Sequence, residues 1–218
     1  MSTKTGKRSS SNRSGTGGKS RSSRARNGAS RGRDVIALIK RDHASVNQLF
    51  RRFNGLSVRA AKSRRNLADR VIKDLSVHAV VEEQVLYPTA RAWLPGGEEL
   101  VREALDEHQG MKEDLAALQK YLPDSEEFDA RMARIEQEVR HHVKEEESAG
   151  GILGQLRQHV SRNQLLEMAK LTRQAKQAAP TRPHPKAPNT PPTNAIVAAV
   201  AAMIDKVRDG LTGRASRS

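Results

Sequence analysis

The sequence predicts an all-α protein: a four-helix bundle with extra C-terminal helices and a disordered basic N-terminal tail. Three observations lead to this prediction. Apolar residues recur at steps of three and four in four successive segments, which is the period of amphipathic helices. Clusters of Pro, Gly and Asn separate these segments. Histidines and glutamates also fall on the apolar faces, four residues apart, so we expect polar chemistry inside the bundle.

Positive charge is concentrated at the two ends of the chain. Residues 1–33 hold ten Lys or Arg and no acidic residue, and a second basic excess lies in residues 180–218, so the net charge of +14 belongs to the tails. Residues 1–33 contain too little apolar surface to offset the entropy lost on ordering, and we expect them to be disordered. They either keep the protein soluble or contact nucleic acid without sequence specificity.

The first bundle helix is expected to start after Asp34, a suitable N-cap, and to stop at Asn54-Gly55. Its apolar positions leave one gap, between Ile39 and Val46. His43 fills this gap, four residues after Ile39 and three before Val46. We therefore place His43 on the buried face. The apolar positions are Ile36, Ile39, Val46, Phe50 and Phe53.

The second helix is expected over residues 60–86, with His78 and Glu82 on its apolar face. Pro88 should disturb the helix, because proline lacks the N–H group that a helix uses, and residues 94–97 should form a loop. The apolar members of this face are Leu67, Val71, Leu75 and Val85.

The third helix is expected over residues 98–122, with His108 in a core position, and Pro123 should end it. Its other core positions are Val101, Ala104, Met111, Leu115, Leu118 and Leu122. Asp124 or Ser125 should cap a fourth helix that carries His142 and Glu146 on its buried face. That face begins with Phe128, Met132, Ile135 and Val139.

Residues 34–148 thus form the predicted bundle, and three segments follow it. Residues 149–179 should be helical near 152–160 and again over 162–178, after a cap at Ser161. Residues 180–193 hold six prolines and should form an extended linker or a strap over the bundle. In residues 194–218, a short amphipathic helix capped by Asn194 and a basic tail should dock on the bundle or on a partner.

The composition excludes several classes of protein. No cysteine is present, which rules out disulfides, thiolate nucleophiles and cysteine-based metal sites. No apolar run approaches the roughly 20 residues that span a bilayer, and the N-terminus lacks the apolar stretch of a secretory signal. We therefore expect a cytoplasmic protein without a transmembrane segment.

Six side chains are candidate metal ligands: His43, His78, Glu82, His108, His142 and Glu146. A single histidine on an apolar face is more often a core residue held by one hydrogen bond. Four of them on four helices, with two carboxylates, suggest a metal site, because buried carboxylates need a compensating cation and the apolar faces contain no Lys or Arg. Imidazole and carboxylate without thiolate suit iron, manganese or zinc, and two carboxylates can bridge two ions.

The pattern H, H-x-x-x-E, H, H-x-x-x-E resembles the hemerythrin-like HHE cation-binding domain, as do the strings R-D-H at 41–43, E-E-Q-V-L-Y-P at 82–88 and H-H-V-K-E-E-E at 141–147. The resemblance covers residues 34–148, and the string at 179–185 is similar to a strap found after the domain in bacterial members. It implies an up-and-down bundle around a non-haem, carboxylate-bridged pair of iron ions. The four histidines would be terminal ligands, and Glu82 and Glu146 would bridge the ions.

The sequence departs from the oxygen-carrying members of that family. Lys112 stands where they have a further histidine, and Glu146 follows His142 at four residues where they have Asp at five. Fewer histidines leave more open positions on iron, which favours reaction with peroxide, superoxide or NO, including catalase-like peroxide decomposition, over reversible O2 storage. Peroxide, O2 and NO are the small ligands that such a centre would bind, sense or decompose. This would fit a role in oxidative stress. The alternatives are iron sequestration, or a non-enzymatic scaffold that binds polyanions through its basic tails.

The polar neighbours of these residues are expected to have ordinary roles. His141 should be solvated or cap the helix, since it points about 100° away from His142. Glu83, Glu145 and Glu147 should be surface charges, with the alternative that they hold a ligand imidazole. Glu138 is a minor alternative for holding His142. Tyr87 and Trp93 should be packing residues.

Overall fold

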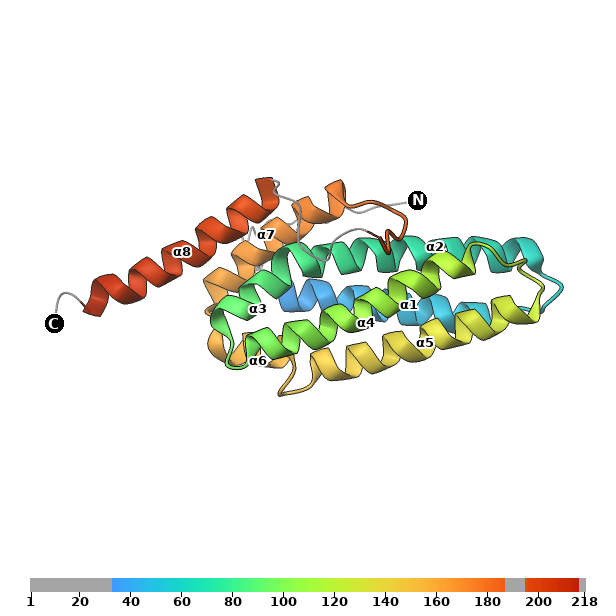
Figure 1. Ribbon diagram of the computed structural model, residues 1–218, viewed down its shortest axis with the longest axis horizontal. Coiled ribbons are helices and arrows are strands. Elements are labelled where there is room, and N and C mark those ends of the chain that lie inside the picture. Colours follow the sequence, from blue (N-terminus) through green and yellow to red (C-terminus); the bar gives the residue numbers. More distant parts are fainter. Residues whose placement is uncertain (1–32, 187–194, 216–218) are drawn as a thin grey trace, which may run out of the picture. The chain divides into compact units, whose positions relative to one another are not determined.

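The computed structural model of the protein describes residues 33–186 and 195–215, with side chains as far as Lys206. Its bundle consists of α1 (Val35–Asn54), α2 (Ala61–Val81), α4 (Gly97–Leu118) and α5 (Glu126–Glu147) (Figure 1). α2 packs on α1 and α4, and α5 packs on α4 and α1, so the four helices close a ring in chain order. The predicted all-α, up-and-down four-helix bundle is confirmed, and no strand occurs in the described ranges.

Two of the bundle helices begin at the residues that the sequence indicates. The Asp34 carboxylate accepts a hydrogen bond from the backbone N–H of Ala37 at 2.9 Å, and the Ser125 hydroxyl accepts one from Phe128 at 3.2 Å. Each side chain satisfies an N–H that has no partner in the first helical turn. Of the two caps considered for α5, the structure therefore uses Ser125.

The prediction of one unbroken helix over residues 60–86 is wrong in detail. α2 ends at Val81, a π-helical turn labelled η1 runs over Glu82–Leu86, and α3 (Tyr87–Trp93) continues the helical path through Pro88. Pro88 has no N–H, and its ring would crowd the carbonyl of Gln84 in a regular α-helix. The wider turn, closed by the Tyr87 N–H on the Glu82 carbonyl, avoids that clash.

Leu122 was expected in the core but is 71% exposed, because α4 already ends at Leu118. Pro123 disfavours helical geometry at the residue before it, so the chain leaves the helix a turn earlier and carries Leu122 outward. The N–H of Lys120 instead closes a turn on the carbonyl of Ala117 at 2.9 Å.

The apolar interior is divided into two parts along the helix axes. The part we call the four-helix core lies between the bundle helices and includes Phe50, Phe53, Leu118 and Phe128. The other, the extension core, lies at the opposite end of α1, α2 and α4 and includes Val35. The candidate ligands fall between the two parts: along α1, α2 and α4 each histidine separates residues of one core from residues of the other, and on α5 His142 follows the last buried residue of the four-helix core near the end of the helix.

Three helices after the bundle complete the extension core: α6 (Ile152–His159), α7 (Arg162–Ala178) and α8 (Ala195–Ala215). Gly154 lets α6 approach the end of α5 closely, because a Cβ atom there would lie 2.1 Å from the Ser148 carbonyl oxygen. α7 starts with the predicted Ser161, which forms a reciprocal capping box with Gln164. Val200 of α8 is buried against this core, so α8 docks in part on its own chain.

The described part of the proline-rich segment, up to Lys186, is not helical and contacts α4 and its C-terminal end. Arg182 donates to the Gln119 side chain at 2.6 Å, and Gln109 donates to the Pro185 carbonyl at 3.1 Å. Of the predicted tail at 1–33, residues 1–32 lie outside the described residues, as does the predicted cap at Asn194. Within those ranges, no helix combines the length and apolar character needed to cross a membrane.

Candidate metal centre

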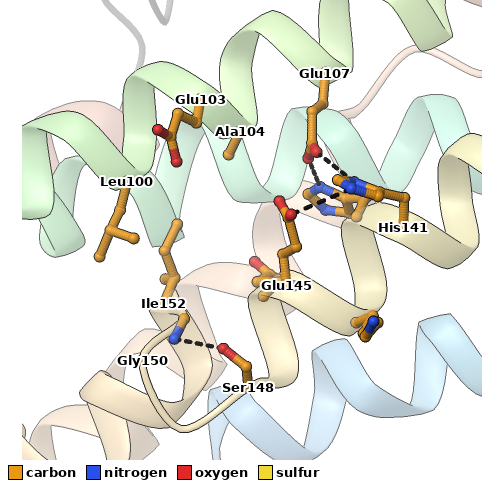
Figure 2. A pocket seen from close by; sticks show the side chains of 13 residues that line it. Leu100, Glu103, Ala104, Glu107, His141, Glu145, Ser148, Gly150 and Ile152 are labelled. Carbon is orange, nitrogen blue, oxygen red and sulfur yellow. Dashed lines mark hydrogen bonds and ion pairs between the residues drawn. The ribbon is translucent and has the colours of Figure 1, made fainter.

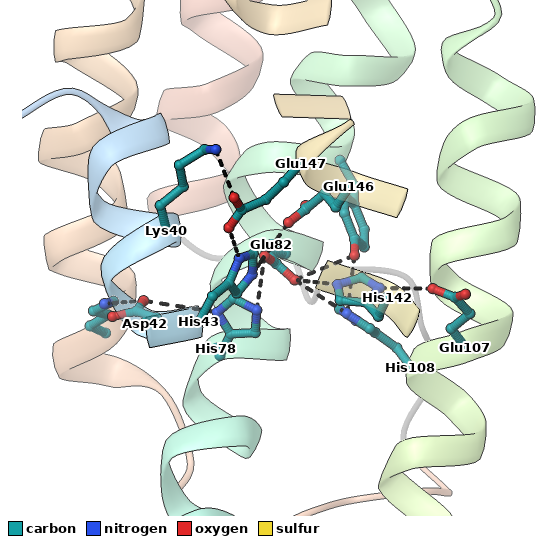
Figure 3. A network of polar contacts seen from close by, with 12 residues as sticks. Lys40, Asp42, His43, His78, Glu82, Glu107, His108, His142, Glu146 and Glu147 are labelled. Carbon is teal, nitrogen blue, oxygen red and sulfur yellow. Dashed lines mark hydrogen bonds and ion pairs between the residues drawn. The ribbon is translucent and has the colours of Figure 1, made fainter. Parts of the chain in front are cut away.

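The structure brings the six candidate ligands together in the middle of the bundle (Figure 3). Glu82 lies at the centre: its Oε1 is 3.0 Å from His78 Nε2, and its Oε2 is 3.2 Å from His108 Nε2. His142 Nε2 is 3.8 Å from the same Oε2. On the other side, His43 Nε2 lies 3.4 Å from Glu146 Oε2. None of the six residues is more than 4% exposed, so the cluster is shielded from bulk water.

All four imidazoles turn Nε2 toward the centre and Nδ1 toward an outer carboxylate. His43 Nδ1 is 2.8 Å from Glu147, His142 Nδ1 is 2.8 Å from Glu107, and His108 Nδ1 is 3.1 Å from Glu83. A proton on Nδ1 that is donated to a carboxylate leaves the Nε2 lone pair free to bind a metal. The fourth pair is looser, since Asp42 is 3.8 Å from His78 Nδ1.

Each outer carboxylate also meets a basic group on its outer side. Lys40 contacts Glu147 at 2.7 Å, Lys112 contacts Glu83 at 2.7 Å, His141 contacts Glu107 at 3.0 Å, and Lys176 of α7 contacts Asp42. Partial burial acts to raise the pKa of Glu147, but hydrogen bonds from Lys40 and His43 outweigh it, and the pKa falls below its usual value. These contacts hold the outer carboxylates in place, so that they can orient the rings.

The sequence indicated only part of this outer shell. Glu83 and Glu147 take the alternative role considered for them, since each holds a ring of the cluster. Asp42 and Glu107 were missed, because they approach His78 and His142 from other helices and no local spacing relates them. Glu138 contacts Arg134 at 2.9 Å, and the ring of His142 is held by Glu107.

Lys112 occupies the position where oxygen carriers have another histidine. Its side chain is largely buried one turn after His108, and its amine lies 2.7 Å from Glu83. A basic side chain therefore does approach the cluster, on the Nδ1 side of His108. It neutralises an outer carboxylate and offers no imidazole to the centre.

Tyr87 also belongs to the cluster, although the sequence predicted only a packing role. Its hydroxyl lies 3.1 Å from His108 Nε2 and 3.4 Å from Glu82 Oε2. The π-helical turn makes this contact possible, because it brings residues five apart onto one face. Burial raises the pKa of Tyr87 well above its usual value, and the Glu82 charge adds to the rise, so the hydroxyl keeps its proton.

The two central carboxylates differ in their electrostatics. Burial acts to raise the pKa of Glu82, but His78 and the other imidazoles outweigh it and hold that pKa well below its usual value. Burial also raises the pKa of Glu146, and the nearby Glu82 charge raises it further. Burial lowers the pKa of His78, but the Glu82 charge reverses this and brings it to about 9. Glu146 is therefore the carboxylate whose charge the protein compensates least.

Several buried polar atoms of the cluster lack a hydrogen-bond partner within the described ranges. Those that face the centre are His43 Nε2, Glu82 Oε1, His142 Nε2 and both oxygens of Glu146, and His78 Nδ1 on the outer side is also unpaired within those ranges. Leaving such atoms unpaired in an apolar interior costs roughly 1–3 kcal/mol each. Ligand atoms of His43, His78, Glu82 and His142 also lie within 4.8 Å of one another. The donor set, its spacing and its missing partners all fit a bound cation.

Comparison with known proteins places these features in a wider context. A family model described as the hemerythrin HHE cation binding domain matches residues 34–149. A DNA nickase from Nostoc sp. is 30% identical over 136 residues, which are 62% of this chain but 37% of that protein, so the chain spans little more than a third of the relative's length.

The fold also has a counterpart among solved structures. A hemerythrin HHE cation binding domain-containing protein from Mycobacterium kansasii matches with a TM-score of 0.55 over 67% of this chain and 90% of that one. The two sequences are 17% identical, so this likeness supports the fold alone.

Proposed function

The chain belongs to the hemerythrin HHE cation binding domain family, and from this premise we propose that it holds two iron ions and uses them to bind, sense or decompose peroxide, O2 or NO. The observation that carries the proposal is the set of inward-facing imidazole nitrogens and carboxylate oxygens that have no hydrogen-bond partner in the described part of the chain. Imidazole and carboxylate ligands without thiolate suit iron.

The six central residues would share the work of holding the ions. His43, His78, His108 and His142 would each give Nε2 as a terminal ligand, and Glu82 and Glu146 would each use both oxygens as a bridge. Iron bound in this way supplies Lewis-acid and redox chemistry toward small oxygen and nitrogen species. The outer carboxylates keep the rings oriented, and the extension core excludes water from one end of the site.

Tyr87 and Lys112 would affect how the ions are held and how many small molecules can reach them. The Tyr87 hydroxyl can donate to Glu82 and so limits how that carboxylate turns. Lys112 pairs with Glu83 where an oxygen carrier has another histidine, so bound ions would keep more positions for exchangeable small molecules. We therefore favour reaction with peroxide or NO, including catalase-like peroxide decomposition, over reversible oxygen storage.

An optical titration tests this function. The iron-loaded protein is reduced without oxygen and then exposed in separate samples to peroxide, O2 and NO. The proposal expects a spectral change with at least one of them that is absent from the Glu82→Gln variant. No change with any of the three would contradict the reactive role and would favour iron sequestration.

A second candidate function is association with DNA. Two observations favour it: residues 1–33 carry ten positive charges, and the Nostoc relative is a DNA nickase. Basic residues that contact phosphates release counterions, so such binding should weaken steeply as salt rises. DNA retardation by the full chain is compared with that by a chain beginning at Asp34. Equal retardation by the two proteins would refute a role for the tail.

A further inference from the structure

A second group of metal-ligating side chains lies on the outside of the bundle, formed by Glu107 of α4 and by His141 and Glu145 of α5. The His141 ring lies between the two carboxylates, with Nδ1 3.0 Å from Glu107 Oε1 and Nε2 3.2 Å from Glu145 Oε1. One ligand atom from each residue lies within 4.8 Å of the other two. A cation with ligands at about 2.0–2.2 Å needs these atoms closer together, at roughly 3–3.5 Å, so the exposed His141 ring would turn to bring one nitrogen toward both carboxylates.

These residues line a cavity of about 350 Å³ between α4, α5 and the start of α6 (Figure 2). His142 and Glu146 of the buried cluster line the same cavity. The Glu146 side chain is 2% exposed, and neither of its oxygens has a hydrogen-bond partner in the described ranges. The cavity therefore has cation ligands on its solvent side and an uncompensated carboxylate on its inner side.

We propose that Glu107, His141 and Glu145 form a solvent-facing site for a divalent cation, from which the cation passes through this cavity to Glu146 and the buried cluster. The site itself does not depend on the proposed function, whereas the passage does. A bound cation takes one nitrogen of His141 and one oxygen from each carboxylate.

Charge and exposure in the cavity suit the first stage of metal uptake. Its lining includes four carboxylates, those of Glu103, Glu107, Glu145 and Glu146, against one lysine, Lys144. Such an acidic funnel raises the local concentration of cations. The His141 and Glu145 side chains are 62% and 55% exposed, so a hydrated ion reaches them and leaves again.

Glu107 links the outer site to the buried one. Its Oε1 faces His141, while its Oε2 accepts a hydrogen bond from His142 Nδ1 at 2.8 Å. The same carboxylate would therefore contact both a cation at the outer site and the His142 ring of the buried cluster. Because Glu107 orients His142, the test leaves it intact and changes only His141 and Glu145.

The first measurement counts weakly bound cations. Full-length protein with its buried centre already filled is titrated with Mn²⁺, and free Mn²⁺ is followed by electron paramagnetic resonance. The wild type should bind one more ion, and the double variant His141→Ala/Glu145→Gln should bind it at least about tenfold more weakly. The matched control His159→Ala/Glu126→Gln, which changes an exposed histidine and an exposed glutamate away from the cavity, should behave as the wild type.

The second measurement follows loading. Metal-free full-length protein is mixed rapidly with Fe²⁺ without oxygen. The double variant should fill about tenfold more slowly than the wild type and the control, and it should reach the same final iron content. An unchanged Mn²⁺ count in the variant would overturn the outer site, and an unchanged loading rate would overturn the passage. If the proposed buried centre were itself wrong, the wild type would hold no metal tightly. That result differs from both of the outcomes above.

Discussion

The same four helices contribute to two contrasting regions, the four-helix core and the ligand cluster. In the four-helix core, side chains such as Phe50 and Phe128 are fully buried among apolar neighbours. A few residues further along the same helices, the cluster buries two carboxylates and four imidazoles and needs a π-helical turn to place Tyr87. The extension core then covers the far side of the cluster with α6, α7 and α8.

This difference separates what stabilises the fold from what the protein does. Apolar burial gains free energy without any ligand. Buried carboxylates such as Glu146 cost free energy until a cation compensates them. The four-helix core should therefore carry the stability of the metal-free protein, while the cluster should stabilise the fold only when it is filled.

The largest effect is expected from Phe50→Ala in the four-helix core. Removing this fully buried ring should lower the free energy of unfolding by about 3–5 kcal/mol. The chains that remain folded should hold as much iron as the wild type, because the cluster lies elsewhere on the helices. Urea unfolding and iron analysis of the folded fraction check this. Lost iron in a fully folded variant would show that the two regions are not separate.

Glu146→Gln should change the free energy of unfolding in opposite directions in the metal-free and the iron-loaded protein. Burial and the Glu82 charge raise the pKa of Glu146 to about 8, so in the metal-free protein above that pH the change removes an uncompensated buried charge and should stabilise the fold by about 1–3 kcal/mol. In the iron-loaded protein it removes a bridging ligand and should destabilise it. Glu145→Gln, a neighbouring and exposed change, should stay within about 0.5 kcal/mol in either state. If Glu146→Gln destabilised the metal-free protein, the cluster would stabilise the fold without a cation, and the contrast with the four-helix core would be wrong.

The same contrast should appear as a pH dependence of the metal-free protein. The pKa of His78 is raised to about 9, and the pKa of His142 is also raised, because Glu82 and outer carboxylates favour the protonated rings against the effect of burial. A raised folded pKa contributes stability that is present below the unfolded pKa and is lost as pH rises through the folded one. The urea midpoint of metal-free protein should fall between pH 6.5 and 9. Iron should remove most of this fall, and an equal fall with iron bound would argue against ligation by these rings.

The smallest effect is expected from Tyr87→Phe. Losing the hydroxyl leaves Glu82 and His108 without one contact and should cost about 1 kcal/mol. The ring still fills its place beside the extension core, so the iron content should not change. Calorimetry and metal analysis of the purified variant measure both quantities. A halved iron content would instead make the phenol oxygen a ligand.

The sequence was sufficient for the bundle and for the convergence of six side chains, because both follow from apolar periodicity. His43, His78, His108 and His142 each replace an apolar residue in a repeat of three and four, so their burial could be predicted one helix at a time. The burial of each histidine can therefore be predicted without knowing how the helices pack.

The features that escaped prediction depend on contacts between helices or on a local change of helical period. Asp42 and Glu107 hold rings of other helices, and Lys176 reaches Asp42 from α7, beyond the bundle. Tyr87 enters the cluster only through the π-helical turn. Pro88 signalled a disturbance there, but its presence does not say which side chain the disturbance redirects.

The most direct test of the account is the iron content of purified protein from iron-replete cells, compared with that of His78→Ala and of the exposed control His159→Ala. The account predicts two iron ions per chain in the wild type and the control, and one or none in His78→Ala. No more than trace iron in the wild type, or the same iron content in all three proteins, would contradict it.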